Sequence, residues 1–135
     1  MFNKLKNLAG NVIAHHAGIE DKGEIMHRIE VQIQTARTLR TAFETTHRHT
    51  PKSPDIIALC RDFYEDGIVL GKKLKQPWFT EQDAREFFDI LELFKTDFER
   101  FEYQECYESS LRNTEYAKRF SRHMSAIINQ LLKLS

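Results

Sequence analysis

The sequence predicts an all-α protein, an up-down four-helix bundle with an additional short N-terminal helix. Three observations lead to this prediction. Apolar residues recur at alternating steps of three and four in four successive segments, Gly and Pro number only five and three, and the breaks between the segments are short. Steps of three and four place side chains on one face of a helix, and short links favour antiparallel neighbours.

Each of the four segments has a row of residues expected to face a shared core. The rows are Met26, Ile29, Ile33, Ala36, Arg40 and Phe43; Ile56, Cys60, Phe63, Gly67, Leu70 and Leu74; Ala84, Phe87, Leu91, Phe94, Phe98 and Phe101; and Ala117, Phe120, Met124, Ile127, Leu131 and Leu134. Fully burying a large apolar side chain contributes roughly 1.5–3 kcal/mol, and this must oppose the entropy of the chain. Arg40 interrupts its row, so we expect it to pair with a nearby acid.

Helix-capping residues precede the predicted segments. Asp21 with Glu24 and Thr80 with Asp83 have the spacing of a capping box, and Ser53 followed by Pro54 is typical of a helix start. The links therefore fall at about 47–53, 76–79 and 109–113, and residues 1–135 are predicted to form a single domain.

The segment 1–17 has a shorter apolar row and two lysines. We expect it to cap the bundle, to exchange into the second subunit of a homodimer, or to rest on a membrane surface, in that order of preference.

Composition argues against several classes of protein. Twenty basic and twenty acidic residues cancel, so no overall field draws the chain to nucleic acid or to an anionic membrane. Cys60 and Cys106 form no close pair, which argues against a zinc finger or a disulfide framework. The sequence has no convincing signal peptide and no apolar run of the roughly 18 residues that a membrane span needs, so a cytoplasmic protein without a transmembrane segment is expected.

No cofactor is expected either. The stretch from Gly67 to Lys73 has one residue too few between its glycines for a phosphate-binding loop, and it lacks a Ser or Thr after the lysine. Gly67 and Gly71 instead allow another helix to approach closely, at a cost of about 1 kcal/mol each in helix stability.

Two Glu-x-x-His pairs, Glu24/His27 and Glu44/His47, match the local spacing of di-iron bundles. Both lie on one predicted helix, about 30 Å apart at the helical rise, so they cannot share a metal centre. In an up-down bundle, however, His47 and His49 lie level with Glu105, and these three residues are candidate ligands of an iron or zinc site. The alternative is a solvated bundle end, where His and Arg complement the negative end of a helix.

Residues 81–108 hold ten acidic and three basic residues, half of all the acids in the chain. We interpret this as an interaction surface for a basic protein partner, comprising Glu99, Glu102, Glu105 and Glu108. The alternative is a solvated face balanced by Lys118, Arg119 and Arg122 of the following helix. Those three cations, or Lys72, Lys73 and Lys75, could contact phosphates, but without interleaved exposed aromatic residues they are a weak nucleic-acid signal.

The sequence therefore predicts a non-enzymatic binding or regulatory module that acts through protein–protein contacts. A metal-binding helical bundle is the alternative, and a nucleic-acid-associated protein is the third hypothesis. No catalytic residue is assigned, because no motif for nucleophilic or general acid–base catalysis is present.

Overall fold

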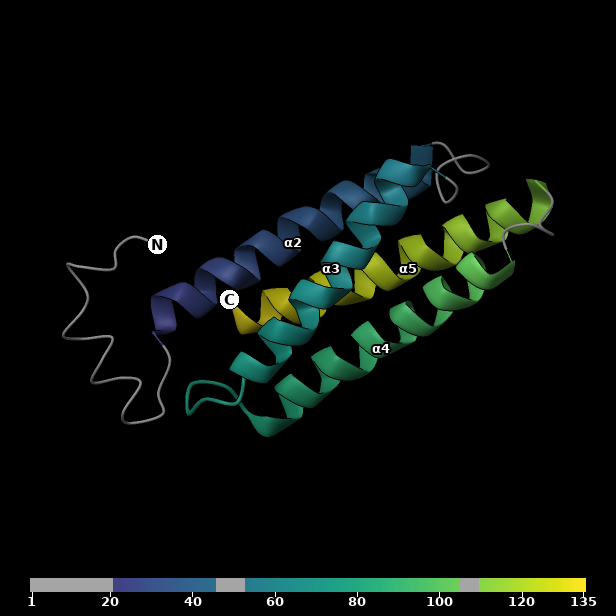
Figure 1. Ribbon diagram of the computed structural model, residues 1–135. Coiled ribbons are helices and arrows are strands. Elements are labelled where there is room, and N and C mark those ends of the chain that lie inside the picture. Colours follow the sequence, from purple (N-terminus) through teal and green to yellow (C-terminus); the bar gives the residue numbers. More distant parts are fainter. Residues whose placement is uncertain (1–20, 46–52, 105–109) are drawn as a thin grey trace.

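A computed structural model describes residues 21–45, 53–104 and 110–135, and these form four helices without a strand. The helices are α2 (Lys22–Thr45), α3 (Pro54–Lys73), α4 (Glu81–Gln104) and α5 (Ser110–Leu134), shown in Figure 1. The predicted all-α bundle is confirmed. The predicted N-terminal helix at 1–17 lies outside the described residues. No helix within the described ranges is long and apolar enough to cross a membrane.

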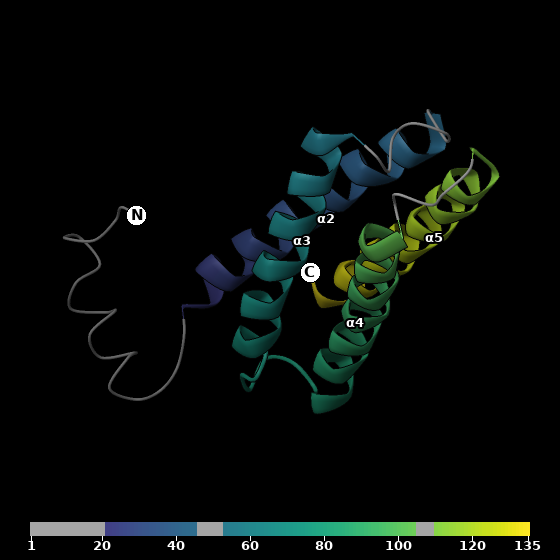
Figure 2. The ribbon, with the colours of Figure 1, turned by 45° about the vertical axis from the view of Figure 1, so that its right-hand side comes forward.

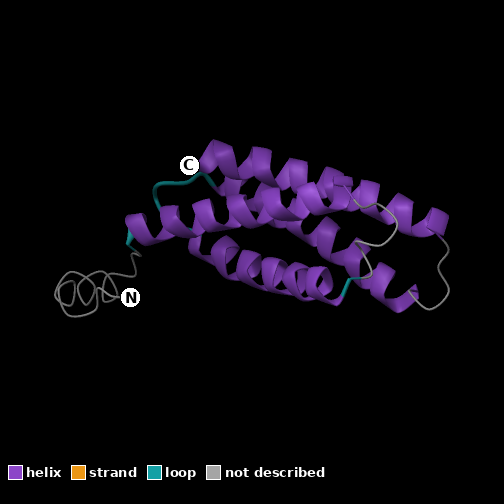
Figure 3. Cartoon of the chain, turned by 90° about the horizontal axis from the view of Figure 1, so that it is seen from above, coloured by secondary structure: helices purple, strands orange, loops and turns teal. Residues whose placement is uncertain are grey.

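Successive helices run antiparallel, as in an up-down bundle (Figures 1 and 2). The most extensive packing joins α2 to α5, followed by α4 to α5, α2 to α3 and α3 to α4. The order around the bundle is therefore α2, α3, α4, α5, with α5 beside both α2 and α4. Seen from above in Figure 3, the helices lie alongside one another.

Three of the four predicted rows face the core as expected. Every residue of the α4 and α5 rows is buried, and so is every residue of the α3 row except the half-buried Ile56. The α2 row is partly wrong, because Met26 and Arg40 are only half-buried while Ile25, Gln32 and Leu39 are buried. The physical reason is that the buried row of α2 includes a polar residue, Gln32, whose side chain is satisfied by the Phe63 carbonyl oxygen of α3, so the apolar pattern alone did not mark this row.

Aromatic rings connect all four helices through the core. Phe43 of α2 packs against Phe120 of α5 with ring centroids 5.3 Å apart, and Phe120 packs against Phe94 of α4 at 5.6 Å. Phe94 in turn meets Phe63 of α3 at 5.9 Å in an edge-to-face arrangement. Such aromatic pairs contribute about 0.5–1.5 kcal/mol beyond the area they bury, so this chain of rings favours one arrangement of the helices.

The capping residues lie where the sequence predicts them. The backbone N–H of Gly23 donates to Asp21 Oδ1 at 3.0 Å, and the N–H of Asp83 donates to Thr80 Oγ1 at 3.0 Å. Ser53 precedes Pro54 in an extended conformation, although its side chain makes no capping hydrogen bond. These contacts satisfy N–H groups that the first turn of a helix leaves without a partner.

The two glycines of α3 allow close contact with neighbouring helices, as predicted. A Cβ on Gly67 would lie 2.8 Å from Leu91 Cδ2 and 3.1 Å from Gln32 Nε2, and one on Gly71 would lie 2.6 Å from Phe88 Cε2. The space at Gly67 also lets Gln32 Nε2 donate to the Phe63 carbonyl oxygen at 3.3 Å. Gly67 therefore accommodates both an apolar contact with α4 and a buried hydrogen bond from α2.

We expect Gly67→Ala to lower the free energy of unfolding by ~1 kcal/mol, because overpacking between buried Leu91 and Gln32 outweighs the gain in helix propensity. Gly23→Ala is the matched control, since Gly23 is exposed and its added methyl would meet only Asp21 Oδ1 at 3.5 Å. That change should stabilise the protein by about 0.5 kcal/mol. Urea unfolding followed by circular dichroism measures both, and a stabilising Gly67→Ala would contradict the tight contact.

Candidate functional site

The side of α4 that faces away from the core forms a continuous exposed surface. We call it the α4 outer face and define it as Asp89, Glu92, Leu93, Thr96, Glu99, Arg100 and Tyr103, all of which are exposed. The rigid core row on the opposite side of the helix holds this face outward. Leu93 is 60% exposed and Tyr103 is 83% exposed, so two large side chains with apolar surface lie among the charged residues of this face.

The carboxylates of this face are only weakly neutralised. Asp89 and Glu92 make no ion pair with any residue that the structure describes, and Glu99 lies 3.9 Å from Lys95. Arg100 is directed to Asp97, with 3.6 Å between Nη1 and Oδ1. Exposed ion pairs at such distances contribute little energy, so the face presents net negative charge to a partner.

The predicted interaction residues divide into three groups. Glu99 lies on the α4 outer face. Glu102 is 23% exposed and pairs with Arg61 of α3, so it links two helices of the bundle. Glu105 and Glu108 lie outside the described residues. Leu93 and Tyr103 were not identified from the sequence as candidate interaction residues. The signal that could have identified them is that both lie outside the predicted core row of α4, among polar residues.

The predicted metal ligands His47, His49 and Glu105 also lie outside the described ranges. Within those ranges, no group of three or more His, Cys, Asp or Glu side chains is arranged to hold a metal ion. The carboxylates of the two Glu-x-x-His pairs have other partners: Glu24 lies 3.6 Å from Arg28, and Glu44 accepts a hydrogen bond from Ser121 at 3.2 Å.

Arg40, expected to pair with an acid, instead donates from Nη1 to Ser125 Oγ of α5 at 3.3 Å. The half-buried Arg40 thus reaches across the most extensive helix contact in the bundle. A neutral hydroxyl suffices as its partner because part of the guanidinium remains in contact with water.

A second charged cluster joins α4 to α5 around Asp97. His123 Nε2 and Asp97 Oδ2 are 2.7 Å apart, and Arg100 and Arg119 each lie 3.6 Å from Asp97 Oδ1. The ring of His123 also packs edge-on against Phe94, with centroids 6.1 Å apart. The single carboxylate of Asp97 is fully engaged by basic side chains of both helices, so we interpret this cluster as a link between the helices.

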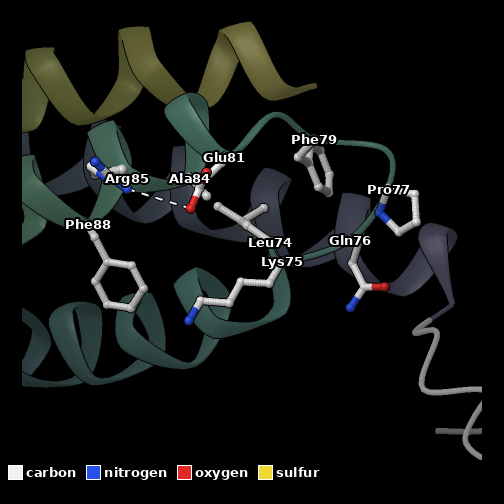
Figure 4. A pocket seen from close by; sticks show the side chains of 9 residues that line it. All are labelled: Leu74, Lys75, Gln76, Pro77, Phe79, Glu81, Ala84, Arg85 and Phe88. Carbon is white, nitrogen blue, oxygen red and sulfur yellow. Dashed lines mark ion pairs between the residues drawn. The ribbon is translucent and has the colours of Figure 1, made fainter.

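The connection between α3 and α4 forms one wall of a pocket of about 550 Å³ (Figure 4). Its apolar lining comprises Leu74, Pro77, Phe79, Ala84 and Phe88, and its polar lining comprises Lys75, Gln76, Glu81 and Arg85. Figure 4 shows Glu81 and Arg85 joined as an ion pair, with 3.6 Å between their charged groups. The volume lies within the range typical of small-molecule sites, so the pocket could hold an apolar group with an anion near Lys75.

Cys60 lies in the core of α3 and is fully buried. Burial, reinforced by the nearby negative charge of Glu102, raises the pKa of its thiol above its usual value of about 8.5. The thiolate is the nucleophilic form, and a raised pKa disfavours it. Cys60 is thus a packing residue, and it offers a probe of how tightly the bundle closes.

We expect Cys60 in a Cys106→Ser variant to react with iodoacetamide far more slowly in the native protein than in urea. Above a pH of about 8.5 the thiol ionises in the unfolded chain but stays protonated in the folded chain. The free energy of unfolding should therefore fall as the pH rises above this value, because the unfolded state then binds fewer protons than the folded state. Mass spectrometry of the alkylated protein over time measures the reaction. Equal rates with and without urea would show that Cys60 is accessible.

Comparisons of the chain with protein-family models, with curated proteins and with solved structures find no match. Function therefore has to be inferred from the surfaces of this chain itself. The Asp97 carboxylate is already engaged by three basic side chains of the chain itself, and two of the four polar residues lining the pocket pair with each other. The α4 outer face is the feature that combines available charge with exposed apolar side chains.

Proposed function

We propose that the chain is a non-enzymatic binding module whose α4 outer face docks a basic protein partner. The observation that carries the proposal is the exposure of Leu93 and Tyr103 among the carboxylates of Asp89, Glu92 and Glu99. Leu93 and Tyr103 are ten residues apart on one helix, which corresponds to about 15 Å at the helical rise. Two apolar anchors at this separation suit a partner helix or strand that lies along α4.

The composition of this face supports protein recognition. Protein interfaces typically have an apolar centre with a polar rim, and tyrosine is among the residues that most often dominate the binding energy. The carboxylates around Leu93 and Tyr103 would attract a basic partner and exclude an acidic one. Because the opposite side of α4 is locked into the core, the face is presented with little cost in conformational entropy.

Reversing two of these charges should weaken docking and leave the bundle folded. We expect the double variant Glu92→Lys/Glu99→Lys to bind its partner at least ~10-fold more weakly, which corresponds to about 1.4 kcal/mol. The measurement is quantitative mass spectrometry of proteins captured from native-cell extract by immobilised wild-type and variant chains. Circular dichroism establishes that both chains are folded.

The matched control is Glu30→Lys/Glu115→Lys, which changes the net charge equally on exposed positions of α2 and α5. Capture should survive in this control. If the α4 variant and the control retain every captured protein at wild-type levels, the α4 outer face is not the docking surface.

A further inference from the structure

The bundle separates its charges into two opposite sides. Helices α3 and α4 carry twelve acidic and six basic residues, a net charge of −6, whereas α2 and α5 carry four acidic and nine basic residues, a net charge of +5. Because α2 packs against α5 and α3 packs against α4, each pair forms one side of the molecule. We call these the acidic side and the basic side. The overall charge of zero conceals this separation.

Ion pairs within the chain neutralise only part of either side. The Arg119–Asp97 pair crosses from the basic to the acidic side, whereas Arg61–Glu102 lies wholly within the acidic side. Among the described residues, no ion pair engages the exposed cations Arg37, Lys118, Arg122 and Lys133 of the basic side. The same holds for Asp62, Glu65, Asp66, Asp89 and Glu92 of the acidic side.

Each side also exposes large apolar side chains among its charges. Val69, Leu93 and Tyr103 are exposed on the acidic side, and Val31 and Leu132 are exposed on the basic side. Each side therefore combines exposed apolar side chains with a net charge, and the two net charges are opposite in sign. The acidic side of one copy is complementary in charge to the basic side of another copy. This complementarity favours their association and determines which faces meet.

We propose that the partner of the α4 outer face is a second copy of this chain, docked through its basic side. This inference rests on the proposed function and names the partner of the same surface. The contact joins two different surfaces, so in a dimer one copy keeps its basic side free and the other copy keeps its acidic side free. Such heterologous contacts continue into closed rings or open filaments.

Sedimentation velocity of the full chain at increasing concentration tests self-association directly. The average mass should rise with concentration and fall when salt is raised from about 50 mM to about 500 mM, because salt screens contacts between exposed charges. A mass that stays at that of one chain under all these conditions overturns the inference.

Two charge-reversed variants then identify the surfaces. Glu92→Lys/Glu99→Lys alters only the acidic side, and Lys118→Glu/Arg122→Glu alters only the basic side. Each variant alone should associate at least ~10-fold more weakly than wild type, because like charges meet at the contact. An equimolar mixture should associate again, because the unaltered basic side of the first variant fits the unaltered acidic side of the second.

Other outcomes are equally informative. If the basic-side variant associates normally, or if the mixture fails to recover, the contact does not join the two sides and the inference is wrong. The control Glu30→Lys/Glu115→Lys adds positive charge to the basic side and should retain association. A chain that stays monomeric while its α4 variant loses a different captured protein would contradict only this inference and leave the proposed function standing.

Discussion

The edge-to-face contact between Phe94 and Phe120 is the interaction on which the arrangement of the bundle depends. Phe120 also meets Phe43 of α2, and Phe94 also meets Phe63 of α3, so these rings connect all four helices in the buried interior. Apolar rows alone would allow helices of similar length to pack in more than one order, because the hydrophobic effect is not directional. Aromatic rings of defined shape and orientation restrict that choice.

The order of helices decides what the surface offers. Because α5 lies between α2 and α4, its cations either meet Asp97 of α4 or add to the basic character of α2. The glycines of α3 bring α4 close, and α4 then presents its remaining carboxylates with Leu93 and Tyr103. Close packing on one side of α4 and exposed charge on the other thus follow from the same arrangement, so the surface proposed to bind a partner is positioned by the packing of the core.

Much of the fold could be predicted from the sequence, because the apolar rows of α3, α4 and α5 are regular and all but one of their residues are buried. The roles of Gly67 and Gly71 were also predictable, since a glycine on a core row implies close approach. The orientation of α2 was predicted only in part, because a polar residue, Gln32, occupies a buried position there. The Asp97–His123 pair could not be predicted, since side-chain pairing between helices depends on their relative rotation and height, which periodicity does not define.

The most direct test of this account is a nuclear Overhauser experiment on protein with selectively labelled phenylalanine rings. The packing of the core predicts cross-peaks from the ring protons of Phe120 to those of both Phe43 and Phe94, whose centroids lie 5.3 and 5.6 Å from that of Phe120. It also predicts a cross-peak between Phe94 and Phe63, at 5.9 Å. Cross-peaks from Phe120 to Phe63 with none to Phe43 would mean a different order of helices, and the separation of charges derived from the present order would then be wrong.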